Sequence, residues 1–180
     1  HVVKRPYEIP SIIYPRPNQT LPPFMSPHEI WMTIDNVKNW KHRTILMVLY
    51  STWMRISEIS NCRIKDIDSI NMRIKIVQGK GLKDRYTLLS QQVLLELRAY
   101  YIMYKPIEYL FNGQERGKRY SIRTIQHVMQ QALIKVGLES KNYTIHTIRH
   151  SFSTHLVDHC PDLNTVKEPL GQRIFQTTKK

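Results

Sequence analysis

Cysteine is scarce in this sequence, and no long hydrophobic run occurs. Only Cys62 and Cys160 are present among 180 residues, which is too few for a disulfide framework, and neither lies in a metal-ligand spacing. We therefore expect a reducing, cytoplasmic setting and no bound metal. The longest apolar run, residues 45–50, is far too short to span a bilayer, and no signal-peptide pattern opens the chain. These absences argue against a secreted, disulfide-rich protein and against a membrane protein.

Acidic residues are also few. The 14 Asp and Glu are outnumbered by 27 Lys and Arg, which gives a formal net charge of +13. Such a surplus predicts a polyanionic partner, with nucleic acid as the first candidate. A basic surface that merely aids solubility is the alternative.

Proline is concentrated at the start of the chain, at positions 6, 10, 15, 17, 22 and 23. Proline fixes φ, removes an amide donor and favours an extended conformation in the residue before it. Residues 1–24 are therefore predicted to be a linker that follows an N-terminal domain outside this sequence. The folded domain is predicted to occupy residues 25–180.

The hydrophobic periodicity of this domain predicts an α+β fold that is mainly helical. Ser26-Pro27-His28-Glu29 is a capping box with proline at the first helical position. Arg73–Ile76 alternates like a half-buried strand, with residues 84–89 as its partner and Gly79-Lys80-Gly81 in the turn. Further helices are expected at residues 40–51 and 55–61, from the caps Ser90 and Ser121 (the second ending at Gly137), at 146–158, and from Asp162.

Three clusters carry residues suited to phosphate chemistry: Arg55 with Glu58, Lys80 in the hairpin, and His146 with Arg149 on one side of a helix. Each has a structural alternative, namely a surface ion pair, a solvated turn lysine and a structural His–Arg pair. Together they form a set suited to one phosphodiester. Arginine presents a planar, permanent charge to phosphate oxygens, whereas lysine and histidine also transfer protons.

The clusters also carry a family resemblance. From about Met25 to Lys180 the sequence resembles the catalytic domain of tyrosine recombinases, the phage-integrase type. That family shows Thr-Gly-Leu-Arg-hydrophobic-Ser-Glu, then Gly-Lys-Gly-x-Lys-x-Arg, then His-x-Leu-Arg-His-x-Phe-x-Thr-His-Leu. The matching segments here are residues 52–58, 79–85 and 146–156, in the same order. The resemblance implies a helical core with a small antiparallel sheet on one side.

The resemblance also implies site-specific DNA recombination or integration, by strand cleavage and rejoining through a 3′-phosphotyrosyl intermediate. Arg55 and Arg149 would hold the non-bridging oxygens of the scissile phosphate. Lys80 would protonate the leaving 5′ oxygen, and His146 would exchange a proton with the nucleophile. Glu58 would orient a neighbour. No cofactor or metal is implied.

The implied partner is double-stranded DNA, held by a homo-oligomer that is a tetramer on DNA when the protein is full length. Further DNA contacts are expected from Lys83, Arg85, His150 and Arg173. The resemblance implies a bacterial or mobile-element origin.

The last motif departs from the family. Gln172 stands where a second histidine is usual, and glutamine donates a hydrogen bond but transfers no proton at neutral pH. By spacing, the nucleophilic tyrosine is expected directly after Lys180, and none of the ten tyrosines in the sequence occupies a matching position. We therefore expect the chain of residues 1–180 to be inactive alone and to form no covalent DNA adduct.

Other departures concern backbone conformation. Trp53 and Cys160 replace family glycines, and a positive φ at either would cost roughly 1–2 kcal/mol. Pro169 replaces a helical leucine, at a cost of about 3 kcal/mol within a helix. These changes suggest a diverged or decaying copy as much as a truncated sequence.

Two alternative functions remain open. A catalytically inactive DNA-binding remnant or regulator derived from a recombinase would use the same basic face without cutting. An RNA-binding or helix-turn-helix regulator fits the charge but explains neither the lysine hairpin nor the pairing of His146 with Arg149.

Overall fold

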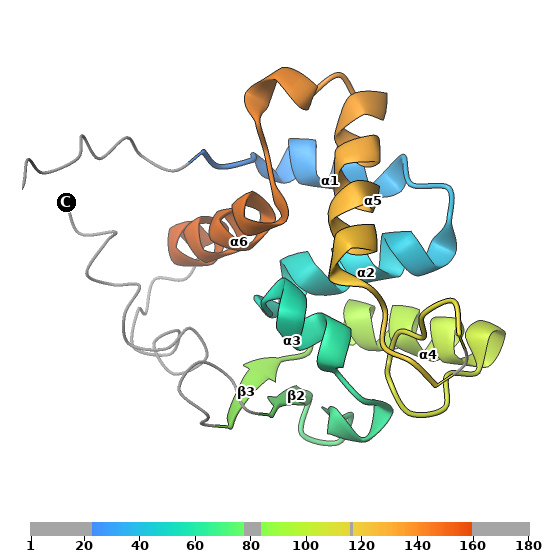
Figure 1. The fold of residues 1–180 in the computed structure, drawn as a ribbon. Coiled ribbons are helices and arrows are strands. Elements are labelled where there is room, and N and C mark those ends of the chain that lie inside the picture. Colours follow the sequence, from blue (N-terminus) through green and yellow to red (C-terminus); the bar gives the residue numbers. More distant parts are fainter. Residues whose placement is uncertain (1–22, 78–83, 116, 160–180) are drawn as a thin grey trace, which may run out of the picture.

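The computed structural model describes residues 23–77, 84–115 and 117–159. The α-helices are α1 (Pro27–Asp35), α2 (Trp40–Thr52), α3 (Ile56–Asn61), α4 (Gln91–Tyr104), α5 (Ile122–Lys135) and α6 (Ile145–His159). Short 3-10 turns span Ile64–Asp66 and Glu139–Lys141, and the strands are β1 (Ile67–Asp68), β2 (Arg73–Ile76) and β3 (Arg85–Leu88). The prediction of a mainly helical α+β fold is confirmed (Figure 1). The helix expected from Asp162 and residues 1–22 of the expected linker lie outside the described residues.

Most helix ends follow the predicted signals. The Ser26 hydroxyl accepts from the Glu29 N–H at 3.3 Å and the Glu29 carboxylate accepts from the Ser26 N–H at 2.8 Å, so the capping box is confirmed. The Ser90 side chain caps α4 in the same way. Ser121 occupies the N-cap position of α5, but its side chain makes no capping hydrogen bond. Gly137 follows this helix with a φ of 71°, the conformation that favours glycine after a helix.

The sheet is antiparallel, with the order β1-β2-β3. Ile74 pairs with Thr87 and Ile76 with Arg85, and both isoleucines are buried. The predicted pairing of residues 73–76 with the segment after residue 84 is confirmed, while its turn, residues 78–83, lies outside the described residues. No pattern in the sequence indicated β1, because a strand of two residues is too short to show alternation.

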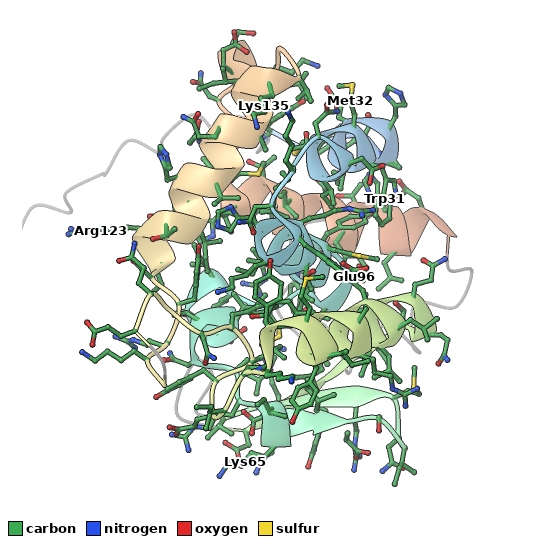
Figure 2. The ribbon with its side chains drawn as sticks, turned by 90° about the vertical axis from the view of Figure 1, so that its right-hand side faces the viewer. Trp31, Met32, Lys65, Glu96, Arg123 and Lys135 are labelled. Carbon is green, nitrogen blue, oxygen red and sulfur yellow. The ribbon has the colours of Figure 1, made fainter. Side chains whose placement is uncertain are left out.

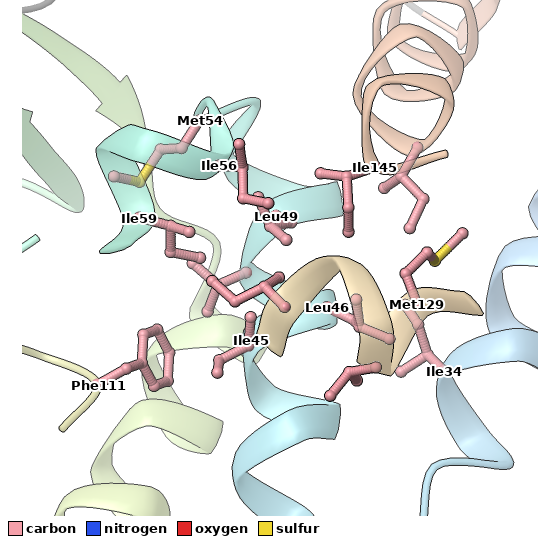
Figure 3. Close-up of a cluster of buried hydrophobic side chains, with 14 of the residues drawn as sticks. Ile34, Ile45, Leu46, Leu49, Met54, Ile56, Ile59, Phe111, Met129 and Ile145 are labelled. Carbon is pink, nitrogen blue, oxygen red and sulfur yellow. The ribbon is translucent and has the colours of Figure 1, made fainter. Parts of the chain in front are cut away.

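Helix α2 lies at the centre of the domain and contacts α1, α4, α5 and α6. Its side chains Ile45, Leu46 and Leu49 are at most 1% exposed, and they pack with Met129 and Phe111 in one continuous hydrophobic cluster (Figure 3). The prediction that this helix is buried is confirmed. A helix surrounded on several sides holds its own C-terminus in a fixed place, and that C-terminus leads into the site described below.

Polar contacts fix the neighbours of α2. The Glu96 carboxylate on α4 accepts from the Trp40 indole at 2.5 Å and from the Thr44 hydroxyl at 2.9 Å, and it lies between the two helices (Figure 2). On the other side, the buried Ser151 hydroxyl of α6 accepts from the Met25 N–H at 2.8 Å. This bond ties the first described residues to α6. The boundary between linker and domain remains a prediction.

The packing of α5 predicts that alanine substitutions at two adjacent residues, Leu133 and Ile134, change the free energy of unfolding by very different amounts. Leu133 is 1% exposed and Ile134 is 53% exposed. Leu133→Ala removes buried methyl groups and leaves a cavity, so we expect a loss of about 2–5 kcal/mol in the free energy of unfolding. Ile134→Ala, the matched control, is expected to change it by less than about 0.5 kcal/mol. Urea denaturation followed by circular dichroism measures both, and equal losses would contradict this packing.

Candidate active site

The site begins at the turn that ends α2. Trp53 adopts φ 53° and ψ 22°, the left-handed region that L-residues other than glycine seldom enter and that costs roughly 1–2 kcal/mol. The positive φ considered from the sequence is therefore present at this position. The Thr87 hydroxyl of β3 donates to the Thr52 carbonyl. This contact ties the sheet to the turn from which the next functional side chains project.

Glu58 joins two arginines. Its carboxylate is 7% exposed and accepts from Arg55 Nη1 at 2.7 Å and from Arg85 Nη2 at 2.7 Å. It also accepts from the backbone N–H of Arg55 at 2.6 Å. Arg55 is the extended N-cap of α3, so the sequence prediction of a helix that begins at Arg55 was early by one residue. This difference lets the Arg55 N–H, as well as its side chain, reach the same carboxylate.

The ionisation of Glu58 is fixed by these partners. Burial acts to raise the pKa of Glu58, but the hydrogen bonds from Arg55 and the charges of Arg85 and Arg55 outweigh it, and the net pKa lies below the ordinary 4.5. Glu58 is therefore a carboxylate at neutral pH. A group in this state cannot act as a general acid there, which agrees with an orienting role.

Arg149 on α6 completes the group. Its guanidinium carbon lies 4.1 Å from the centre of the Trp53 ring, and that of Arg85 lies 5.9 Å from the same ring. Burial lowers the pKa of Arg149 to about 10, with a further contribution from the charge of Arg55. Arg149 remains protonated at neutral pH. It forms no ion pair with any residue in the described ranges.

Three buried N–H donors of this group have no hydrogen-bond partner among the described residues: Arg85 Nη1, Arg149 Nε and Trp53 Nε1. A buried donor without an acceptor costs about 1–3 kcal/mol. The site also holds three arginines but a single carboxylate, which pairs with only two of them, Arg55 and Arg85. The excess positive charge and the unmatched donors both favour an oxygen-bearing anion.

The histidines of α6 flank Arg149. His146 and His150 are both exposed, and His146 lies in the first turn of the helix, three residues before Arg149. Burial lowers the pKa of His150, and the charges of Arg149 and His146 add to this effect. His150 is therefore mainly neutral at pH 7 and contributes little permanent charge to the site.

The structure brings together Arg55, Glu58, Arg85 and Arg149, which come from α3, β3 and α6. In the view of Figure 1 these elements lie to the left of α4, and β3 leads into α4 through Leu89 and Ser90. Lys80, Lys83, Gln172 and Arg173 lie outside the described residues. The chemical roles assigned to all these residues remain predictions.

Sequence reasoning missed two features of the site. Trp53 was noted only for its backbone, and Arg85 only as a DNA contact, whereas Trp53 stacks on Arg149 and Arg85 pairs with Glu58. The available signal was a tryptophan two residues before Arg55 in a chain with separate arginine motifs, because indole rings are the preferred partners of guanidinium groups.

The described residues contain neither a metal-binding cluster nor a membrane-spanning helix. No group of three or more His, Cys, Asp or Glu side chains there is placed to hold a metal ion. No helix in the same ranges is long and apolar enough to cross a membrane. Cys62 is buried, and burial raises the pKa of its thiol to about 12, so it stays protonated and unreactive.

Comparison with known proteins places this arrangement in a family. The model of the phage integrase family matches residues 23–180. The chain belongs to the phage integrase family. A putative integrase/recombinase of Sinorhizobium fredii is 37% identical over 172 residues, which cover 94% of this chain and 56% of that relative. The tyrosine recombinase XerC of Lacticaseibacillus casei is 34% identical, covering 99% of this chain and 63% of the relative. The chain thus spans between half and two thirds of these relatives.

Solved structures of this integrase family share the fold. The crystal structure of XerA recombinase superposes with a TM-score of 0.77 at 27% identity, covering 91% of this chain and 60% of that one. The XerH site-specific recombinase gives a TM-score of 0.75 at 24% identity, and the match covers 89% of this chain and 50% of XerH. The helical core with its three-stranded sheet is the family's catalytic-domain fold.

The geometry of Glu58 predicts a pH-dependent effect on stability. Glu58→Gln keeps the side chain's shape but removes the charge between two arginines, so we expect a loss of about 1–3 kcal/mol at pH 7. Because the folded-state pKa of Glu58 is lowered from 4.5, its contribution is present above that value and is lost as the pH falls through the folded pKa. The difference between wild type and Glu58→Gln is therefore expected to shrink on acidification.

Urea denaturation at neutral pH and at about pH 3 measures this difference. Asp35→Asn is the control, because its pair with Arg43 is exposed and surface pairs contribute about 0–1 kcal/mol. A Glu58→Gln protein as stable as wild type at pH 7 would contradict the interpretation.

Proposed function

We propose that this site binds the scissile phosphate of duplex DNA during site-specific recombination by strand cleavage and rejoining. The observation that carries the proposal is a group of three arginines, Arg55, Arg85 and Arg149, at a site whose one buried carboxylate pairs with only the first two, with donors left unmatched. A phosphodiester supplies both the charge and the acceptor oxygens that this arrangement favours. Membership of the phage integrase family supports the same assignment.

Arg55 and Arg149 would stabilise the transition state. Arg149 is largely desolvated, so its fixed charge would meet the added negative charge of a pentacoordinate phosphate with little water between them, while the Arg55 side chain, 33% exposed, would reach the same phosphate from the solvent side. The ion pair with Glu58 keeps the Arg55 guanidinium group in one orientation. Preorganised charge of this kind lowers the barrier because no reorganisation is needed as the reaction proceeds.

Proton transfers would fall to Lys80 and His146, with Lys80 protonating the leaving 5′ oxygen. His146 lies on the same helix as Arg149 and one turn before it, which supports a role in proton transfer at the same phosphate. The nucleophile would be the family's tyrosine, expected after Lys180, and the reaction would pass through a 3′-phosphotyrosyl link. We further propose that the full-length protein acts as a homo-oligomer on DNA.

DNA binding without strand cleavage is a second candidate function for the same site. The residue Gln172, at the position of a family histidine, favours a protein that binds DNA without cutting it. Both functions place phosphate between Arg55 and Arg149. XerH, which shares this fold, has been captured with difH substrate before cleavage and with palindromic difH substrate after it, and binding of a substrate of that kind fits either function.

DNA binding should fall steeply with salt. The net charge of +13 implies release of condensed counterions, and each phosphate contact contributes about −0.9 to the slope of log affinity against log salt concentration. We expect Arg55→Ala and Arg149→Ala each to weaken binding of a random-sequence duplex about tenfold and to reduce the slope by about 0.9. Fluorescence anisotropy over a range of salt concentrations measures both quantities.

Arg98→Ala is the matched control, because Arg98 is an exposed arginine on α4 and is not one of the arginines of the site. It is expected to leave the affinity within about twofold of wild type. If the Arg55 and Arg149 variants bind like the Arg98 variant, the site is not a phosphate-binding site and both proposed functions fail.

A further inference from the structure

We infer that Trp53 is a positioning residue for Arg149: its ring holds the guanidinium in the orientation that presents its N–H groups to phosphate. This inference rests on the proposed phosphate-binding function. The resemblance places a glycine at this position, so a role for the tryptophan belongs to this chain's own residues.

The first support is the backbone. Trp53 occupies a left-handed turn at φ 53°, where glycine is unstrained and every other L-residue except asparagine and aspartate is disfavoured. The side chain is nevertheless 7% exposed and contacts the site rather than projecting into solvent. A strained conformation that persists at a functional site suggests a compensating interaction there.

The second support is the stacking geometry. The Arg149 guanidinium carbon lies 4.1 Å from the ring centre, which is well within the range of a cation–π contact. A guanidinium held by its face keeps its edge free, and the edge carries all of its N–H donors. A carboxylate partner would occupy those same donors, whereas contact with an indole ring uses none of them as a hydrogen bond to an acceptor oxygen.

The third support is the difference between the arginines. Arg55 and Arg85 are held by Glu58 at 2.7 Å each, whereas Arg149 has no ion pair in the described ranges. Buried Arg149 Nε has no hydrogen-bond partner there either. The indole face is therefore the contact that orients Arg149. The centre of the Trp53 ring also lies 5.9 Å from the guanidinium carbon of Arg85, so the ring is near both Arg149 on α6 and Arg85 on β3.

The test compares Trp53→Phe with Trp53→Leu. Both variants keep an L-residue in the left-handed turn and both remove the indole N–H, so the main difference between them is the aromatic face. We expect Trp53→Phe to bind a random-sequence duplex within about twofold of wild type, and Trp53→Leu to bind about 3- to 10-fold more weakly. In an Arg149→Ala background the two variants are expected to bind equally, because the residue through which the ring acts has been removed.

A spectroscopic measurement tests the stacking apart from DNA binding. Ring currents shift the Hδ protons of Arg149 upfield in the NMR spectrum, and the signal is assigned by its loss in Arg149→Ala. The shift is expected in wild type and in Trp53→Phe and is expected to be lost in Trp53→Leu. Circular dichroism confirms that each variant is folded before binding is measured.

The outcomes separate the two proposals. Equal binding by the Phe and Leu variants, or a difference between them that survives in the Arg149→Ala background, overturns the role of Trp53. Absence of the upfield shift in wild type does so as well. If the shift is present but Arg149→Ala binds DNA like wild type, the phosphate-binding function itself is wrong, and the inference falls with it.

Discussion

The buried carboxylate of Glu58 is the interaction on which the geometry of the site depends. It accepts from the side chains of Arg55 and Arg85 and from the Arg55 backbone, and thereby joins the start of α3 to the edge strand β3. Without it, two guanidinium groups would face each other across a poorly solvated space, where like charges repel strongly. Because the one carboxylate pairs with two arginines, the site keeps a net positive charge, while both guanidinium groups are held in place by their ion pairs.

Trp53 shows how a local strain and a tertiary contact depend on each other. The turn after α2 would accept glycine more readily, yet the tryptophan there is buried, with its ring centre 4.1 Å from Arg149 and 5.9 Å from Arg85. The Thr87 hydroxyl bonded to the Thr52 carbonyl holds the same turn from the sheet side. The end of a helix buried on several sides thus positions charged residues from three other elements, because a packed core deforms little.

Local signals predicted much of the fold. The capping box at Ser26, the cap at Ser90, the glycine after α5 and the alternation of residues 73–76 all act within a few residues, and the structure confirms each of them. Other features gave no such signal. Strand β1 exists because Ile67 and Asp68 pair with Ile74 and Arg73, and nothing in two residues reveals a partner. Helix α3 begins at Ile56 because Arg55 is extended and donates its backbone N–H to the Glu58 carboxylate. The sequence pattern does not reveal that hydrogen bond.

The sequence by itself determined the family, the helical class and the residue types of the site, because motif order and hydrophobic period are one-dimensional properties. The tertiary structure alone decided which charges meet. The pairing of Arg85 with Glu58 spans 27 positions, and Arg149 reaches Trp53 from a helix at the far end of the described chain. Such contacts depend on how helices and strands pack, and packing is set by the complete core rather than by any one segment.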